Sequence, residues 1–321
     1  MTLISALQRS DVTVRRYTAS DTAAWDACVR DSRNGTFLHL RSYMDYHADR
    51  FPDASLFVLD GDRIIAALPA TIRDAGLHSH AGLTYGGLIV GRDFHGSHAL
   101  PAFAAIGAWG VEHQLNRLVY KAIPHIYHRM PAEEDLYALV CLGARLSRRD
   151  LSTSLWLSGR YAPAKGRKAC ITKAAREGLE VRVTGDYAAF MRIEAEHLRE
   201  KHGVAPTHSA EEIALLAARF PANIRLVGAY DRERLLGGVI VYLTDCVCHA
   251  QYIGATEEGK RRCVLDACLS HVMTHLCNEV RWFDFGISTT DAGRVLDEPL
   301  LLNKESWGGR SVVYDQYEWV F

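Results

Sequence analysis

Apolar and polar residues alternate with helix-like and strand-like periodicities, and these follow one another in a similar order in the two halves of the chain. In the second half, helical periodicity is predicted at 186–202 and again up to residue 219, where Ser209 and Glu212 have the spacing of an N-terminal capping box. A further helix is predicted at 263–277 and a partly helical segment at 294–307. Strands are predicted at 180–183, 224–230, 235–243, 246–255, 282–286 and 311–320.

The first half has the same plan. Strands are predicted at 12–17, 55–60, 63–72, 118–122 and 145–157, with an extended segment at 77–90. Helices are predicted at 21–30, 41–50, 98–113 and 133–142. Residues 158–172 are basic and contain glycine, which predicts a connection between the halves.

Two pairs of segments repeat in the same order. Residues 59–68 (LDGDRIIAAL) match 230–239 (YDRERLLGGV), and residues 117–123 (RLVYKAI) match 281–287 (RWFDFGI). Each pair is separated by a similar interval, which indicates a duplicated domain. We therefore expect an α/β (α+β) protein with two domains at 1–157 and 158–321, each a mixed, mostly antiparallel sheet flanked by helices.

Composition and charge narrow the class of protein. The chain has 321 residues, is 48% apolar and carries a net charge of −1, as ordinary soluble proteins do. It lacks the basic excess of a nucleic-acid-binding protein and any run of ~20 apolar residues, so neither a nucleic acid partner nor a membrane span is expected. Because residues 1–9 do not resemble a signal peptide and the eight cysteines form no Cys-x-x-Cys pair, we expect reduced thiols and a cytoplasmic location.

A metal is not expected, although the chain has fifteen histidines. His78 with His80, and His271 with His275, are pairs without a third ligand at motif spacing, whereas catalytic zinc usually has three protein ligands.

Seven segments together resemble the tandem-GNAT, Fem-like acyltransferases. They are residues 34–39 (NGTFLH), 78–87 (HSHAGLTYGG), 120–128 (YKAIPHIYH), 200–204 (EKHGV), 249–254 (HAQYIG), 283–288 (FDFGIS) and 303–310 (NKESWGGR). The order of elements is also that of two GNAT folds. The resemblance covers nearly the whole chain.

The resemblance leaves the substrate to be chosen between two branches. One branch uses acyl-CoA to acylate the amino group of nucleotide-linked amino-dideoxy sugars for bacterial O-antigen or capsule. The other takes an aminoacyl group from tRNA. The balanced charge and the lack of an inserted helical hairpin favour the sugar branch, with an acetyl or 3-hydroxybutyryl donor and a dTDP-sugar acceptor. Two alternative functions stay open: a Fem-like transferase that uses aminoacyl-tRNA, and a degenerate protein that only binds CoA or nucleotide sugar. A homodimer also stays open.

The resemblance implies that CoA binds where the strand at 246–255 enters the next helix. Backbone N–H groups at a helix N-terminus bind phosphate. The segment departs from the family's glycine signature, because Gly259 is the only residue that could supply its glycine. Three cations follow Gly259 and are expected at the start of the helix. The predicted donor-binding residues are Ile253, Gly254, Gly259, Lys260, Arg261, Arg262 and Asn303.

Strand alternation predicts the catalytic face. His249 and Gln251 share one face of their strand, and Cys248, Ala250 and Tyr252 take the other. Asp284 and Ser288 share a face of the 282–286 strand and its extension. The resemblance implies that these two strands splay apart around the thioester, so His249 is expected to accept the amine proton and Asp284 to orient it. Lys304 lies in a segment similar to the Fem-type Phe-Lys-x-x-Phe-Gly and is expected to stabilise the oxyanion or to hold a substrate phosphate.

The first half holds nine of the fifteen histidines but no convincing phosphate loop at 91–98. We therefore expect it to bind the acceptor. The predicted acceptor-binding residues, including three from the second half, are His80, Tyr85, Lys121, His125, Tyr127, His128, His202, Gln251 and Ser288.

Overall fold

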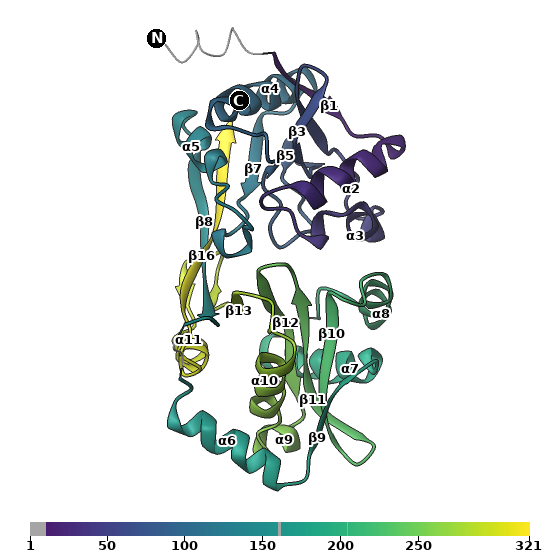
Figure 1. The fold of residues 1–321 in the computed structure, drawn as a ribbon, viewed down its shortest axis with the longest axis vertical. Coiled ribbons are helices and arrows are strands. Elements are labelled where there is room, and N and C mark those ends of the chain that lie inside the picture. Colours follow the sequence, from purple (N-terminus) through teal and green to yellow (C-terminus); the bar gives the residue numbers. More distant parts are fainter. Residues whose placement is uncertain (1–10, 160–161, 204) are drawn as a thin grey trace. The chain divides into compact units, whose positions relative to one another are not determined.

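The computed structural model describes residues 11–159, 162–203 and 205–321 (Figure 1). It divides into two compact units. Unit 1 comprises residues 11–150 of the described chain with 292–294 and 313–321, and unit 2 comprises the described part of 151–291 with 295–312. The two units therefore divide after Asp150, and the last strand returns to unit 1. The domain boundary at 157/158 stays a prediction.

Unit 1 contains two groups of strands. An antiparallel sheet has the order β1-β2-β3-β6, made of β1 (Val12–Arg16), β2 (Leu56–Asp60), β3 (Arg63–Leu68) and β6 (Ile89–Val90). In the second group, the hairpin of β4 (Thr71–Arg73) and β5 (Gly76–His78) precedes β7 (Arg117–Lys121). Strand β7 pairs in parallel with β5 and antiparallel with the end of β16 (Arg310–Val320), and the beginning of β8 (Arg145–Trp156) follows.

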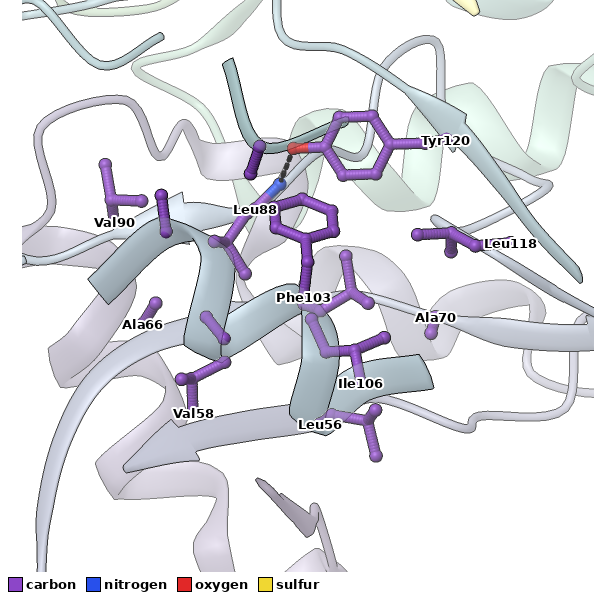
Figure 2. Close-up of a cluster of buried hydrophobic side chains, with 14 of the residues drawn as sticks. Leu56, Val58, Ala66, Ala70, Leu88, Val90, Phe103, Ile106, Leu118 and Tyr120 are labelled. Carbon is purple, nitrogen blue, oxygen red and sulfur yellow. Dashed lines mark hydrogen bonds between the residues drawn. The ribbon is translucent and has the colours of Figure 1, made fainter. Parts of the chain in front are cut away.

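Helices cover both faces of the first sheet. Trp25 of α2 (Thr22–Asp31) packs on Phe57 of β2, with 5.4 Å between the ring centroids. On the other face, Phe103 and Ile106 of α4 (Gly96–Glu112) pack on alternate residues of β2 (Figure 2). The hydroxyl of Tyr120 on β7 closes this core by accepting the N–H of Leu88 at 2.6 Å. The smaller helices of the unit are α3 (Arg41–Met44) and α5 (Glu134–Cys141), with short 3-10 turns at Ala19–Asp21, Phe37–His39, Asp45–His47 and His125–Tyr127.

Unit 2 contains one continuous sheet. Strands β9 (Glu180–Thr184), β10 (Ile224–Asp231), β11 (Arg234–Leu243) and β12 (Val247–Ala255) are antiparallel neighbours. Strand β12 then pairs in parallel with β13 (Trp282–Ile287), which pairs antiparallel with the end of β8. A small hairpin of β14 (Thr289–Thr290) and β15 (Val295–Leu296) follows.

Two helical layers enclose this sheet. Helix α10 (Val264–His275) buries Val264, Cys268 and Val272 against one face, in a core that includes Val239, Cys248 and Phe283. Helices α7 (Tyr187–His202) and α8 (Ala210–Arg219) contact the other face, and α8 begins with the predicted capping box. Helices α6 (Lys165–Arg176), α9 (Glu257–Arg261) and α11 (Glu298–Glu305) complete the unit. Among the described residues, no helix combines the length and apolar character that a bilayer crossing requires.

The predicted fold class is confirmed, with two local corrections. The connection predicted at 158–172 contains α6, because lysine, arginine and alanine favour helix and Arg167 is anchored by Asp266 at 2.9 Å. The extended segment predicted at 77–90 forms only the short strands β5 and β6, joined by an irregular segment. Its glycines approach other backbone closely, since a Cβ at Gly86 would clash with the carbonyl of Ser79.

Candidate functional site

The parallel strands β12 and β13 diverge in unit 2. They pair only at Val247–Trp282, Cys248–Phe283 and His249–Asp284, although both continue beyond these residues. The edges of two strands that no longer pair with each other present N–H and C=O groups that a ligand can hydrogen-bond. The predicted splaying is therefore present, and it begins at His249 and Asp284.

A β-bulge at Gln251 changes the predicted faces of β12. Ile240 pairs with Tyr252 and its successor Val241 pairs with Ala250, so β12 carries one extra residue. Because paired residues point to the same side and Ile240 and Val241 point to opposite sides, Tyr252 and Ala250 lie on opposite faces. The prediction that Tyr252 shares a face with Ala250 is wrong. Tyr252 lies on the face of His249, away from α10.

His249, Asp284 and two serines form a hydrogen-bonded network. Nδ1 of His249 lies 2.7 Å from Oδ2 of Asp284. Ser152 and Ser154 of β8 both donate their hydroxyls to Oδ1, at 2.6 and 2.7 Å. The carboxylate accepts the Nδ1 proton, which leaves Nε2 of the imidazole as an acceptor. The side chain of Asp284 is fully buried whereas that of His249 is 14% exposed, so the histidine alone can meet a substrate.

Asp284 is held as a carboxylate. Burial would raise its pKa, but the hydrogen bond from His249, the charge that this histidine carries when it is protonated, and the two serine hydroxyls outweigh burial and lower the pKa to about 2. The predicted contact of Asp284 with His249 is therefore present, although its catalytic role stays a prediction. Ser152 and Ser154 were not identified from the sequence, because their partner lies on a strand more than a hundred residues away.

Lys304 stabilises the end of β13. Its Nζ donates to the carbonyls of Gly286 and Ile287 at 2.8 and 2.6 Å, and the side chain is buried. These carbonyls follow an irregular register between Asp284 and Ile287, where Gly286 adopts a φ of +78°. Burial lowers the pKa of Lys304 to about 8. This geometry supports a positioning role for the lysine, and the oxyanion role stays a prediction.

Glu194 is a buried acid that sequence reasoning missed. It lies on α7, is 5% exposed, and its Oε2 has no hydrogen-bond partner among the described residues. A Cβ at Gly254 would clash with this oxygen, which explains the glycine in β12. Burial raises the pKa of Glu194 to about 7. Nearby, the Tyr252 hydroxyl lies 2.7 Å from Nδ1 of His208. Nothing in the sequence indicated this burial, because a glutamate within a helical pattern of apolar and polar residues is usually expected on the exposed face.

Glu194→Gln is expected to stabilise the protein at pH 8 and to change little at pH 4.5. Because burial raises the carboxyl pKa from 4.5 to about 7, the native state binds the extra proton in that window. The free energy of unfolding of the wild-type protein therefore falls by about 2–3 kcal/mol as the pH rises through that window. Urea unfolding at both pH values measures the difference. Exposed Glu196 on the same helix provides the control Glu196→Gln, and equal effects at both pH values would contradict the expectation.

The cations predicted at a helix start lie at a helix end. Lys260 and Arg261 are in the last turn of α9 and Arg262 follows it, which is the favourable end of the dipole for positive charge. Arg262 contacts Glu177, Asp231 and Glu258. The first turn of α9 instead carries two glutamates. The expected placement of these cations at the start of α9 is therefore wrong, and their contact with a phosphate stays a prediction.

The other predicted donor residues have local structural roles. The N–H of Gly259 donates to the capping Thr256 hydroxyl at 3.0 Å, and a Cβ at Gly259 would clash with the Leu236 carbonyl. Ile253 packs on the α10 core. Asn303 is exposed on α11, and its carbonyl accepts a hydrogen bond from Arg167 at 3.3 Å. Contact of these residues with CoA stays a prediction.

Most of the predicted acceptor residues in unit 1 are interior. His80, Tyr85, Tyr127 and His128 are buried, and only His125 is exposed. His80 adopts a φ of +50°, and burial lowers its pKa to about 3. Lys121 donates to the carbonyls of Ala81 and Leu83, and burial lowers its pKa to about 8.

These contacts organise the segments before and after β7 rather than an open surface. Tyr127 and Tyr314 share a hydrogen bond of 2.9 Å, and His128 contacts the Ile123 carbonyl at 3.0 Å. The acceptor-binding role of the cluster stays a prediction. In unit 2, Ser288 is buried and Gln251 is half-buried in the bulge. The side chain of His202 lies outside the described part of the chain.

Comparison with known proteins supports the fold. Residues 165–292 match the family model of an acetyltransferase (GNAT) domain. The crystal structure of FemX is similar at a TM-score of 0.67 and 10% identity, covering 96% of this chain and 97% of that chain. The C-terminal domain of a putative lysylphosphatidylglycerol synthetase from Agrobacterium fabrum is similar at 0.62 and 12%, covering 94% and 91%.

A tandem GNAT protein from the clavulanic acid biosynthesis pathway is also similar, at a TM-score of 0.50 and 16% identity, covering 96% of this chain and 98% of that chain. No curated protein matches at a significant level. At these identities the structural likeness concerns the fold alone. Residues 165–292 thus match a GNAT acetyltransferase domain, and the chain has a GNAT-like fold similar to that of tandem GNAT proteins.

Proposed function

We propose that the chain is an acyl-CoA-dependent N-acyltransferase that acylates the amino group of a nucleotide-linked amino sugar. The observation that carries this proposal is the placement of the His249–Asp284 pair at the point where β12 and β13 diverge. A proton acceptor thus lies beside free strand edges within a GNAT domain. The choice of a nucleotide-linked sugar as the acceptor, rather than another amine, rests on the sequence resemblance.

His249 would accept a proton from the acceptor amine. With its Nδ1 proton directed to Asp284, Nε2 would keep a free lone pair for the substrate. The amine nitrogen would attack the thioester carbon that acyl-CoA supplies, and its proton would pass to Nε2. The C–S bond then breaks, and the departing thiolate takes up a proton from the imidazolium or from water, so that CoA leaves as the thiol and the histidine becomes neutral again. Asp284 holds the imidazole in the required tautomer and stabilises the imidazolium that forms.

The residues present fit part of CoA. The unpaired edges of β12 and β13 suit the amide groups of a pantetheine arm, which can hydrogen-bond to backbone as an added strand does. The diphosphate has weaker support, because Arg262 is already paired with acids and α9 begins with Glu257 and Glu258. Backbone N–H groups at the start of α9 are the remaining candidates.

Mass spectrometry of the product tests the proposal. The purified protein is incubated with acetyl-CoA or 3-hydroxybutyryl-CoA and with dTDP-linked 3-amino or 4-amino sugars. We expect an acylated nucleotide sugar that does not form when the 4-amino or 3-amino group is replaced by hydroxyl. Absence of product in every combination, with thermal stabilisation by nucleotide sugar but not by acyl-CoA, would instead identify a non-catalytic binding protein.

An aminoacyl-tRNA-dependent transferase is the second candidate, and one observation favours it. Helix α6 exposes Lys165, Lys168, Lys173 and Arg176, a basic surface that suits a polyanion better than CoA alone requires. Transfer of a labelled amino acid from aminoacyl-tRNA, without turnover of any acyl-CoA, would favour this candidate.

A further inference from the structure

We propose that Cys170, Cys263 and Asp266 form a binding site for a thiophilic divalent cation, with Zn²⁺ as the ion that best fits the donors. The site lies within unit 2 and joins α6 to the junction between α9 and α10. It is independent of the proposed acyl transfer.

The three donors lie close together from separate parts of the fold. Cys170 comes from α6, Cys263 lies between α9 and α10, and Asp266 is in the first turn of α10. One ligand atom from each residue lies within 4.8 Å of the others. Two thiolates and a carboxylate are the ligand types that Zn²⁺ binds with tetrahedral geometry. Because both cysteines are half-buried, a fourth position stays open to water.

The backbone holds Cys263 in an unusual conformation. Its φ is +57°, in the left-handed region that β-carbon-bearing residues rarely adopt. The residue ends α9, where its N–H donates to the Lys260 carbonyl at 3.2 Å, and begins α10, where its carbonyl accepts the N–H of Ala267 at 3.2 Å. Glycine would adopt this φ at less cost, so a cysteine at this position carries backbone strain.

Arg167 orients the third ligand. Its Nη1 donates to Oδ1 of Asp266 at 2.9 Å, and its Nε donates to the Ser306 hydroxyl at 2.8 Å. The guanidinium also lies over the Trp307 ring, 5.7 Å from the centroid. Ligating carboxylates typically have such a hydrogen-bonded partner, which fixes the oxygen that faces the metal. Two thiolates, one carboxylate, one guanidinium and a divalent cation sum to zero charge.

Other thiols and histidines of the described chain offer fewer donors. Cys248, Cys268 and Cys277 are buried in the α10 core or beside it. His271 and His275 are neighbours on α10, 4.5 Å apart by ring centroids, but they are only two ligands. The Cys170–Cys263–Asp266 group is the set of three that the described residues bring together.

Cobalt substitution tests the site in the full-length protein. Co²⁺ is added to freshly reduced protein after a thiol assay has confirmed that all eight cysteines are reduced. We expect one equivalent to give a thiolate-to-cobalt charge-transfer band in the near ultraviolet and visible d–d bands of a tetrahedral ion, both removed by Zn²⁺. Cys170→Ser and Cys263→Ser should abolish the charge-transfer band or reduce it by about half, and Arg167→Gln should weaken Zn²⁺ binding by about 10–100-fold.

Two controls isolate the site. Cys28→Ser removes a half-buried thiol of unit 1, and His275→Ala removes one member of the histidine pair; both should leave the bands unchanged. If the serine variants do not fold, alkylation mapped by mass spectrometry replaces them, and Zn²⁺ should protect Cys170 and Cys263 but not Cys28. Absent charge-transfer bands in reduced protein, bands of undiminished intensity in both serine variants, or equal protection of all three thiols would overturn the proposal.

Discussion

His249→Ala is expected to lower kcat by about 10²–10⁴-fold and to leave acyl-CoA affinity nearly unchanged, because general-base assistance contributes on that scale. The imidazole lies where β12 and β13 diverge, and Asp284 fixes its Nδ1 proton. Alanine retains the strand but removes the acceptor for the amine proton. Steady-state kinetics with both substrates measures kcat and KM, and isothermal titration measures the affinity for acyl-CoA.

Chemical rescue separates this role from a structural one. Free imidazole should restore part of the activity of His249→Ala, since a small base can enter the space left by the side chain. His275→Ala removes an exposed histidine of α10 and should retain wild-type kcat. Full activity in His249→Ala, or a loss confined to KM for the sugar, would show that the amine loses its proton by another route.

Asp284→Ala is expected to lower the free energy of unfolding by about 3–5 kcal/mol, the cost of removing one partner from a buried ionic network. Its carboxylate is fully buried and accepts hydrogen bonds from Ser152, Ser154 and His249. Alanine would leave two interior hydroxyls without their acceptor and a cavity beside β13. Urea unfolding at pH 7 measures the change.

The pH dependence of stability should change with the same residue. The pKa of Asp284 is lowered from 3.8 to about 2, so its stabilising contribution is complete above 3.8 and is lost as pH falls through 2. Asp284→Asn should therefore flatten the stability curve between these values while retaining the shape of the side chain. Glu279→Ala, at an exposed acid, is the control. A loss below 1 kcal/mol in Asp284→Ala would contradict the assigned network.

Local periodicity was sufficient for most elements of the fold. Helices α4, α7, α8 and α10 and strands β8, β10, β11 and β12 lie close to their predicted ranges, because each buries one face with a regular repeat. Helix α6 was missed because it buries only Ala174 and is held by Arg167 and Lys173, whose partners lie far away in the sequence. The extended segment predicted at 77–90 forms strands only at its ends, because its glycines pack against backbone.

The sequence alone determined which residues are candidates for the chemistry. Alternation on two strands pointed to His249 and Asp284, and the periodicities of both halves gave the GNAT-like order of elements. The tertiary structure decided which face and which partner each residue has. It placed Tyr252 on the face of His249 through a bulge and buried Oε2 of Glu194 without a hydrogen-bond partner among the described residues. It also placed the Lys260–Arg262 cations at the end of α9. The physical reason is that period and propensity act over a few residues, whereas burial, register shifts and ion pairs depend on segments that meet only when the chain folds.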